Sequence, residues 1–276
     1  MAHISKHSSS SSTPTAAANS PSSFFAPRTY GAIALAFAVG LLAGSHALDN
    51  YNNTKTSSTA AASATSAASA VVPPEWKTRK FWPADLEAHF GIHAVPTLLI
   101  PETLRPYVDS HDITTDYGYL KNQDLYDNYA RVFGPFIDTL PTRAPDERLY
   151  VQWTGDVKKF GVFSTIYIPS GTFLAEYSGL LVNHSRSTDY EWSYLSDIPD
   201  KDGHTMSLGI DAQVVGNIAR FINHDDDPNA DSVYVPWRNA WRVLYVSVRD
   251  IWPGEEVTVS YGANYWETRN KAAATA

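Results

Sequence analysis

Hydrophobic positions are distributed unevenly along the chain, and its beginning shows no pattern typical of a packed domain. Residues 1–28 are a polar tract of mainly Ser and Ala, which cannot bury enough apolar surface to fold and is predicted to be disordered. Residues 49–74 form a second low-complexity stretch, rich in Thr, Ser and Ala, which ends at Pro73-Pro74 and is predicted to be a flexible linker. The residues between these two tracts, 29–48, are almost wholly apolar.

This apolar segment carries no formal charge over residues 30–48, which is close to the ~20 residues that a helix needs to cross a bilayer. Its Ala- and Gly-rich composition leaves three interpretations open. A single-pass membrane anchor is favoured. A cleaved mitochondrial or secretory targeting peptide would also explain the small residues at 45–47 and the acid-free, Ser-rich start. A buried core helix would have nothing nearby to pack against.

Helical spacing of apolar residues occurs twice between residues 75 and 148, over Pro83–Phe90 and Asn122–Leu140. The second pattern consists of Leu125, Tyr129, Val132, Phe133 and Phe136. No chemical motif occurs in this stretch. We therefore expect a small accessory helical region that covers one edge of the following domain.

Short runs of β-branched and aromatic residues separated by turns dominate the chain from residue 149 onward. Strands are predicted to begin at Gly161 and to cover Leu174–Leu181, Trp241–Val248 and Val257–Tyr261. Pro-Gly turns at residues 168–171 and 251–254 separate them. The pattern predicts a mostly β domain with short helices over residues 149–266, followed by a disordered tail at residues 267–276.

Charge and cysteine content narrow the possible functions. Residues 49–276 contain all 29 acidic residues but only 19 of the 21 basic ones, so no nucleic acid binding is expected. Such an acidic domain would accept a basic peptide, although the charge would equally well serve only to keep the domain soluble. The absence of cysteine excludes a disulfide, a thiolate zinc site and a cysteine nucleophile.

Three segments of the β domain carry distinctive residue combinations. The first is residues 159–163 (KFGVF), followed by the turn at 168–171 (IPSG) and by 176–179 (EYSG). The second is residues 216–224 (GNIARFINH), closed by Pro228-Asn229, and the third is residues 249–262 (RDIWPGEEVTVSYG). A glycine such as Gly161 lets backbone approach a ligand without a Cβ clash.

In this order and spacing the three segments resemble the signature blocks of the SET-domain protein-lysine methyltransferase family. The resemblance covers about 115 residues, and the second block agrees at nine consecutive positions. It implies a SET-type β-clip fold with a pseudoknot-like crossing, in which one segment threads beneath another. It also implies methyl transfer from S-adenosyl-L-methionine to a lysine side chain of a protein substrate.

The resemblance also implies a set of site residues. Tyr261 and Tyr177 would be the catalytic tyrosines, lining the channel through which the lysine stem enters. The residues implied in cofactor binding are Gly161, Arg220, Asn223, His224, Tyr261 and, near the tail, Trp266, with Tyr265 as an alternative to Trp266.

Four positions depart from the family pattern. Lys159 stands where the first glycine of the first block is expected, and Asp225, Asp226 and Ser260 replace the usual Ser, Cys and Asp. The missing cysteine at position 226 agrees with a tail that has none, so the chain resembles the branch without a zinc-binding tail, and no metal is expected. The three aspartates at 225–227 are interpreted as a solvated acidic turn rather than a metal site.

Two questions stay open at this level. The departures keep alive a catalytically inactive SET fold that serves as a binding or scaffold protein, and residues 182–208 give no indication of the substrate. Orientation in a membrane is poorly determined, because one basic residue, Arg28 or Lys55, flanks each end of the apolar segment. Sequons at Asn52 and Asn183 favour a lumenal domain, whereas the implied cofactor and substrate favour the cytosol, which we prefer.

Overall fold

The computed structural model describes residues 72–144, 146–183, 188–199, 202–262 and 265–266. The predicted disordered segment at 1–28, the apolar segment at 29–48, nearly all of the linker and the tail at 267–276 lie outside the described residues. None of the helices in the described part is long and apolar enough to cross a membrane.

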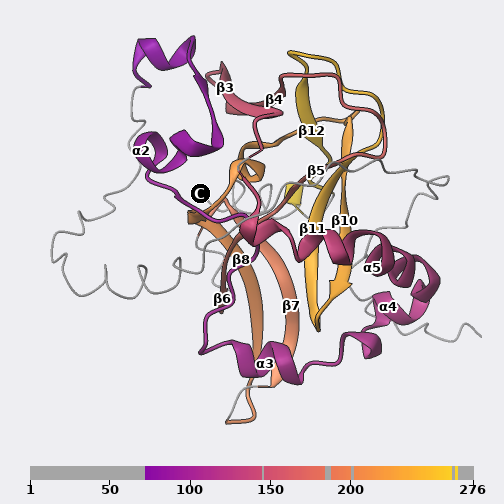
Figure 1. Ribbon diagram of the computed structural model, residues 1–276. Helices are drawn as coiled ribbons and strands as arrows, with labels where there is room; N and C mark the ends of the chain where they lie inside the picture. The colour runs from indigo at the N-terminus through magenta and orange to yellow at the C-terminus, as the bar shows by residue number, and fades with distance from the viewer. Residues whose placement is uncertain (1–71, 145, 184–187, 200–201, 263–264, 267–276) are drawn as a thin grey trace, which may run out of the picture. The chain divides into compact units, whose positions relative to one another are not determined.

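Short helical elements dominate the first part of the described chain (Figure 1). The 3₁₀ helices are η1 (Pro74–Lys77), η2 (Pro83–Asp85), η3 (Ile113–Thr115) and η4 (Leu140–Thr142). The α-helices are α2 (Leu86–Phe90), α3 (Arg105–Ser110), α4 (Tyr117–Lys121) and α5 (Gln123–Ile137). Two short strands, β1 (Lys80–Phe81) and β2 (His93–Ala94), lie among them.

Strands make up most of the rest of the chain. They are β3 (Leu149–Gly155), β4 (Lys159–Ser164), β5 (Phe173–Glu176), β6 (Gly179–Asn183), β7 (Glu191–Pro199), β8 (Thr205–Gly216), β9 (Asn223–His224), β10 (Ala230–Trp237), β11 (Ala240–Ser247) and β12 (Glu256–Val259). One further 3₁₀ helix, η5 (Ile218–Phe221), connects β8 to β9. The fold is mostly β with short helices, as predicted.

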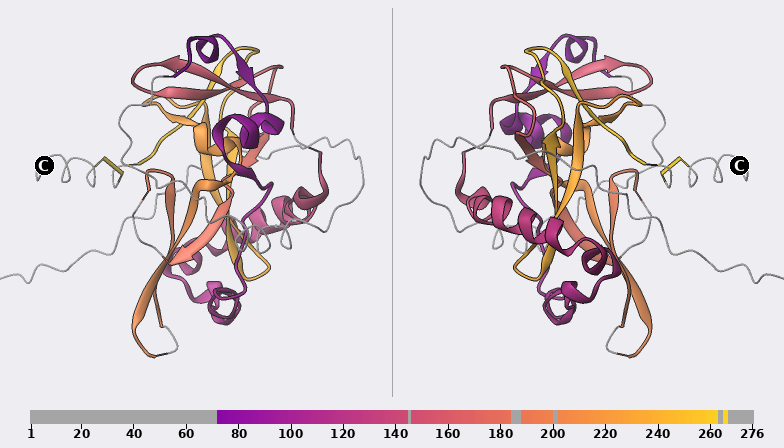
Figure 2. Two further views of the ribbon diagram at one scale, coloured as in Figure 1. Left: turned by 90° about the vertical axis from the view of Figure 1, so that its left-hand side faces the viewer. Right: turned by 90° about the vertical axis from the view of Figure 1, so that its right-hand side faces the viewer.

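The strands form three sheets (Figures 1 and 2). The five-stranded sheet has the order β1-β3-β4-β12-β9, and the three-stranded sheet has the order β10-β11-β5. The third sheet has the order β2-β8-β6, and β7 also pairs with β8. The accessory region therefore supplies two strands, because β1 pairs with β3 and β2 pairs in parallel with β8. The helical patterns alone did not predict these two pairings.

The predicted crossing lies in the five-stranded sheet, where β12 is inserted between β4 and β9. It pairs antiparallel with β4 and in parallel with β9, which comes more than thirty residues earlier in the chain. Buried Asn229 fastens the crossing from the side: its Oδ1 accepts the N–H of Thr258 at 2.9 Å and its Nδ2 donates to the carbonyl of Glu256 at 2.7 Å. The Pro-Asn that closes the second sequence block is thus a structural clamp.

Helix α5 covers the three-stranded sheet through the five apolar residues that its sequence pattern identified, together with Ile137. Tyr129, Phe133 and Ile137 are buried against β10 and β11, while Leu125, Val132 and Phe136 pack at the margin of the same cluster. The β10–β11 hairpin closes with Arg238 and Asn239, both at positive φ (51° and 56°), as a tight two-residue turn requires. Arg238 then pairs with Asp138 at the end of α5, at 2.9 Å.

A buried ion pair joins the sheets to the accessory region. The carboxylate of Glu176, at the end of β5, is fully buried and accepts hydrogen bonds from Arg242 Nε at 2.8 Å and Nη2 at 2.9 Å. It also accepts the Leu98 N–H at 3.1 Å and the Thr97 hydroxyl at 2.7 Å. The carbonyl of Glu176 accepts the side-chain amide of Asn217 at 2.8 Å. One residue therefore connects β5, β11, the loop after β2 and the start of the second block.

We expect Glu176→Ala to lower the free energy of unfolding by about 3–5 kcal/mol, because it leaves the Arg242 guanidinium without its buried partner. Urea denaturation of the full-length protein followed by near-ultraviolet circular dichroism measures this change. The matched control is Glu102→Ala, which removes a highly exposed carboxylate paired with Arg105 and should cost less than about 1 kcal/mol. Equal effects of the two substitutions would contradict a central role for Glu176.

Candidate active site

Tyr261 lies two residues after the end of β12, and two hydrogen bonds fix its position. Its hydroxyl donates to the carbonyl of Ile222 at 2.8 Å, and its backbone N–H donates to His224 Nδ1 at 3.2 Å. Both partners belong to the second block, thirty-seven and thirty-nine residues upstream. The crossing thus brings the tyrosine of the third block onto the asparagine–histidine pair of the second, as the resemblance implied.

The same contact favours one tautomer of His224. Because Nδ1 accepts the Tyr261 N–H, the ring proton is on Nε2, which faces Asp226 Oδ1 at 3.2 Å. The Asp226 side chain is fully exposed, so water screens this pair and it stabilises little. The residue that replaces the family's metal-binding cysteine therefore serves as a weak partner of the histidine.

The backbone of His224 is turned away from the sheet. In the parallel pair of β9 and β12, His224 lies opposite Val259, and the Val259 carbonyl accepts the N–H of Asp225 rather than that of His224. In this register the N–H and C=O of the residue opposite Val259 point away from β12. That residue is His224, and β9 is the last strand of the five-stranded sheet. The site consequently presents a donor and an acceptor from one main-chain residue.

Aromatic rings surround this edge. The Trp266 ring centroid lies 5.0 Å from the His224 ring, Tyr265 lies 4.7 Å from Tyr261, and Tyr265 and Trp266 are 5.0 Å apart. Trp266 keeps 42% of its surface exposed, so one side of the group is accessible to a flat ligand. The structure brings together Tyr261, His224, Trp266 and its alternative Tyr265.

Tyr177 lies just after β5 and is buried, with 7% of its surface exposed. Its hydroxyl donates to the carbonyl of Tyr190 at 2.7 Å. Burial raises the pKa of Tyr177 well above its ordinary value; Arg220 opposes the rise, and nearby Tyr261 adds to it. The two predicted catalytic tyrosines therefore lie within electrostatic range of each other, and each hydroxyl proton is donated to a backbone carbonyl.

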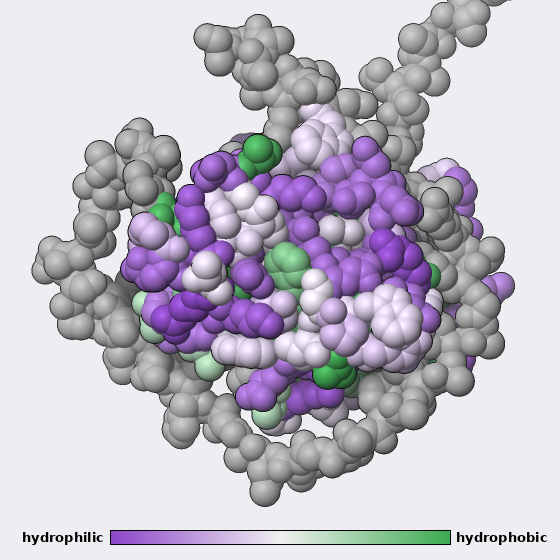
Figure 3. Space-filling view, turned by 90° about the horizontal axis from the view of Figure 1, so that it is seen from above, coloured by the Kyte–Doolittle hydropathy of each residue, from purple (hydrophilic) through white to green (hydrophobic). Residues whose placement is uncertain are grey.

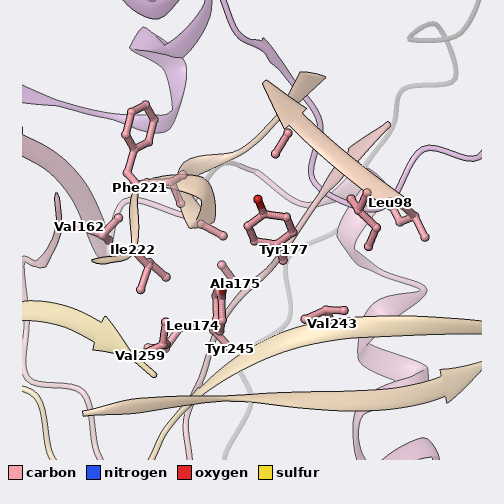
Figure 4. Packing of buried hydrophobic residues seen from close by; sticks show 14 of the residues in the cluster. Leu98, Val162, Leu174, Ala175, Tyr177, Phe221, Ile222, Val243, Tyr245 and Val259 are labelled. Atoms are coloured by element: carbon pink, nitrogen blue, oxygen red, sulfur yellow. The ribbon is translucent and has the colours of Figure 1, made fainter. Parts of the chain in front are cut away.

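Two residues that the sequence analysis did not select enclose Tyr177. The rings of Trp192 in β7 and Tyr245 in β11 lie 5.3 Å and 6.2 Å from its ring, and Figure 4 shows Tyr245 beside Tyr177 and Ala175. Burial also raises the pKa of Tyr245 well above its ordinary value. Aromatic residues in strands are ordinary core residues, so only the three-dimensional arrangement identifies these two as walls of the site.

Gly161 and Asn223 meet, but in a different way from the one expected. A Cβ added at Gly161 would lie 2.4 Å from Glu256 Oε1 and 3.0 Å from Asn223 Nδ2, so side chains of this protein fill the space beside the glycine. Asn223 Nδ2 donates to the Phe160 carbonyl at 3.0 Å and to Glu256 at 2.8 Å. These two predicted cofactor residues join β9 to β4 and β12, and the Asn223 amide nitrogen is already engaged.

Arg220 is directed toward the tyrosines. Its guanidinium lies 3.7 Å from the centroid of the Tyr190 ring, and its Nη1 donates to the carbonyl of Gln213 at 2.7 Å. Desolvation lowers the pKa of Arg220, and the neighbouring tyrosines counteract this change. The contacts assign Arg220 to holding Tyr190, whose carbonyl in turn holds Tyr177.

The departures from the family pattern have separate structural consequences. Lys159 adopts a positive φ of 64°, the left-handed region that favours glycine, so the backbone keeps the conformation expected of the family glycine at some cost in strain. The turn at 225–227 is closed by a bond from the Asp227 N–H to Asp225 Oδ1. No group of three His, Asp or Glu side chains able to hold a metal ion occurs within the described ranges.

Comparison with known protein families identifies the domain that contains this site. Residues 159–262 match the SET domain family model. The chain contains a SET domain.

Several relatives share this SET domain. Mouse (Mus musculus) histone-lysine N-methyltransferase EHMT1 is 38% identical over 129 residues, which are 45% of this chain and 10% of the relative. Drosophila melanogaster histone-lysine N-methyltransferase Set2 is 34% identical over 108 residues, 38% of this chain and 5% of the relative. The chain thus spans about a tenth or less of the length of these relatives.

Solved structures match this chain as well, among them the following two. ATXR5 in complex with a histone H3.1 is 22% identical, covers 64% of this chain and 84% of that chain, and has a TM-score of 0.46. KRYPTONITE, in complex with DNA, a histone H3 peptide and SAH, is 31% identical, covers 42% of this chain and 23% of that chain, and has a TM-score of 0.35.

Asn223→Ala should lower the free energy of unfolding by about 1–3 kcal/mol, because the Phe160 carbonyl and Glu256 lose a partly buried donor. Displacement of β9 should also weaken the S-adenosyl-L-methionine binding that the family resemblance implies. Urea denaturation and calorimetric titration of the full-length protein measure the two effects. Asn128→Ala on α5, whose amide oxygen accepts only an exposed bond from Arg131, is the control. Unchanged stability in Asn223→Ala would contradict the bracing role.

Proposed function

We propose that the SET domain transfers a methyl group from S-adenosyl-L-methionine to the side-chain amine of a lysine in a protein substrate. The observation that carries the proposal is the pair of tyrosines. Tyr177 and Tyr261 come from different blocks, lie within electrostatic range, and each donates its hydroxyl proton to a backbone carbonyl.

This arrangement suits the positioning of an amine. Because the hydroxyl protons are donated to the carbonyls of Tyr190 and Ile222, the two phenolic oxygens face a lysine amine as hydrogen-bond acceptors rather than as donors. Two fixed acceptors orient the amine, and holding reactants in line at near-contact distance contributes several kcal/mol to the rate. The rings of Trp192 and Tyr245 beside Tyr177 exclude water from this region.

The same burial favours the neutral amine that a nucleophile requires. Desolvation disfavours a charged ammonium, so a lysine that enters among the buried tyrosines has a lowered pKa. S-adenosyl-L-methionine, when bound, supplies a methyl group on a positively charged sulfur that departs as a neutral thioether. The nearby cation lowers the pKa of the lysine further by like-charge repulsion.

The residues present fit this cofactor. The outward N–H and C=O of His224 suit the polar edge of an adenine, and the half-exposed Trp266 ring suits its face. Gly161 and Asn223 would act by holding β4, β9 and β12 in place, and Arg220 by holding Tyr190. No metal is needed for this chemistry.

A basic protein segment is the proposed substrate. The relatives are named as histone-lysine methyltransferases, which makes a histone tail the first peptide to test. The excess of acidic residues after residue 48 is compatible with such a peptide. Residues 182–208, which include β7, are where we expect selectivity to be determined.

A catalytically inactive binding or scaffold protein is the second candidate. The departures at Lys159, Asp226 and Ser260 favour it, while the retained and well-positioned tyrosines favour the enzyme. Calorimetric titration with S-adenosyl-L-methionine separates the two, because a scaffold that has lost the chemistry has no need to bind the cofactor.

Tyr261→Phe tests the enzyme directly. The substitution keeps the ring and removes the hydroxyl, so stability should change by less than about 1 kcal/mol. Methyl transfer to histone peptides, followed with labelled cofactor, should fall at least about tenfold or change in the number of methyl groups added. Tyr150→Phe, in a buried tyrosine that stacks on Phe163 in the β3–β4 pair, is the control. Unchanged rate and product for Tyr261→Phe would remove this residue from the mechanism.

We further propose that residues 30–48 anchor the protein in a membrane, with the SET domain on the cytosolic side. Full-length protein should sediment with membranes and resist carbonate extraction, whereas a variant in which Leu41 and Leu42 are replaced by Lys should be released, since charge at the middle of a span is unfavourable. Protein that carbonate extracts completely would contradict the anchor. A glycosidase-sensitive shift in gel mobility would contradict the orientation.

A further inference from the structure

Basic residues gather at one edge of an otherwise acidic protein. The two segments that meet there, residues 74–82 and 153–161, contain five basic residues and only two acidic ones, although the whole chain has a formal charge of −8. The basic residues are Lys77, Arg79, Lys80, Lys158 and Lys159, and all five are exposed. We call this group, with Trp82, Trp153 and Val157, the basic edge.

Backbone pairing makes the basic edge one surface. Strand β1 is the outermost strand of the five-stranded sheet, with Lys80 opposite Gln152 of β3, and β3 and β4 form the adjacent hairpin. Lys77 and Lys159, which are far apart in sequence, both lie over the Trp153 ring, at 5.2 Å and 5.7 Å. Figure 3 views the molecule from above, and hydrophilic residues predominate on that face.

Nearby acids neutralise only part of this charge. Asp156 lies 3.8 Å from Lys77, and both side chains are well exposed, so water screens the pair. Asp85 pairs with Arg79 at 3.3 Å. Lys80 rests 4.2 Å from the Tyr150 ring centroid, and neither Lys80 nor Lys158 has an ion pair with a described carboxylate.

The basic edge also presents apolar groups at its rim. Val157, at the tip of the β3–β4 hairpin, is 96% exposed, and Trp82 is partly exposed beside Lys80. A protruding apolar tip and tryptophan among lysines is the combination found where proteins lie on a lipid surface, since aromatic rings favour the headgroup level and lysines attract anionic lipids. Lysines on an edge strand also discourage strand association, but that role needs no exposed valine at a hairpin tip.

We propose that the basic edge docks the SET domain on a membrane surface rich in anionic phospholipid. The inference does not depend on methyl transfer. A second argument is the position of the basic edge in the sequence. Only residues 49–71 separate the apolar segment at 30–48 from Val72, where the described chain begins, and Lys77 follows five residues later. The basic edge is therefore close in sequence to the proposed membrane anchor. A docked domain would hold its orientation to the bilayer rather than turn freely at the end of a linker.

The absence of cysteine makes a clean test possible. Val157→Cys in the full-length protein gives a single thiol for a nitrobenzoxadiazole fluorophore at the hairpin tip. Leu120→Cys on α4, also exposed at 62%, is the matched reporter away from the basic edge. Because the full-length protein carries the proposed anchor, each labelled protein is reconstituted into phosphatidylcholine vesicles and into vesicles containing 30% phosphatidylserine, with and without nitroxide-labelled lipid as a quencher.

Docking predicts a blue shift and nitroxide quenching at position 157 on the anionic vesicles, reversal of both in 0.5 M salt, and no response at position 120. Lys77→Gln, Lys80→Gln and Lys158→Gln together should lower the ratio of docked to undocked domain on the order of a hundredfold, about fivefold per lysine. Lys121→Gln on α4 should leave it unchanged.

No response at 157, an equal response on neutral vesicles, or an equal response at 120 would overturn the proposal. A response to a duplex oligonucleotide in place of vesicles would assign the surface to nucleic acid instead. Methylation assays do not enter the readout, so failure here leaves the proposed enzyme activity untouched.

Discussion

The bidentate pair between Glu176 and Arg242 is the interaction on which the rest of the described structure depends. It is buried, and a buried carboxylate and guanidinium tolerate that position only when every polar atom finds a partner. Thr97 and Leu98 supply two further donors from the loop after β2. The accessory region therefore supplies hydrogen-bond donors that the buried Glu176 carboxylate in the core of the SET domain requires, in addition to covering one edge of that domain.

A second set of contacts acts on the crossing, and asparagines provide most of it. Asn217 connects the start of η5 to Glu176, Asn223 connects β9 to β4 and β12, and Asn229 connects the entry of β10 to β12. An asparagine side chain carries both donor and acceptor, so it can bridge backbone groups that no regular ladder reaches. The asparagines of the second block thus form internal hydrogen bonds on both sides of β9, the edge strand of the five-stranded sheet. The main chain of His224 in this strand faces outward.

Sequence reasoning found the fold through these same residues, and its limits follow from physics. The nine-residue block and the Pro-Asn that follows it identified the crossing, and the spacing of Tyr129 and Phe133 identified α5. Strand pairing was beyond reach where it depends on distant partners: β1 and β2 are two residues long and exist only because β3 and β8 are beside them. The pairing of β7 with β8 is irregular, with register shifts near Leu195. Residues 182–208 therefore show no regular alternation of apolar and polar residues, and the sequence did not identify Trp192 as part of the site. The contacts of Gly161 and Asn223 with Glu256 could not be predicted from the sequence, because a close approach of backbone does not reveal whether a ligand or another side chain fills the space.

The anchor of the Tyr177 hydroxyl has a consequence for how this domain could diversify. The acceptor is the main-chain oxygen of Tyr190, which any residue at that position would supply. Apart from Tyr190 and Trp192, whose rings contact Arg220 and Tyr177, the side chains between β6 and β8 can therefore change without altering this anchor. Under the proposed function, peptide recognition can vary between related domains while the geometry at Tyr177 is kept, because the two use different atoms of the same loop.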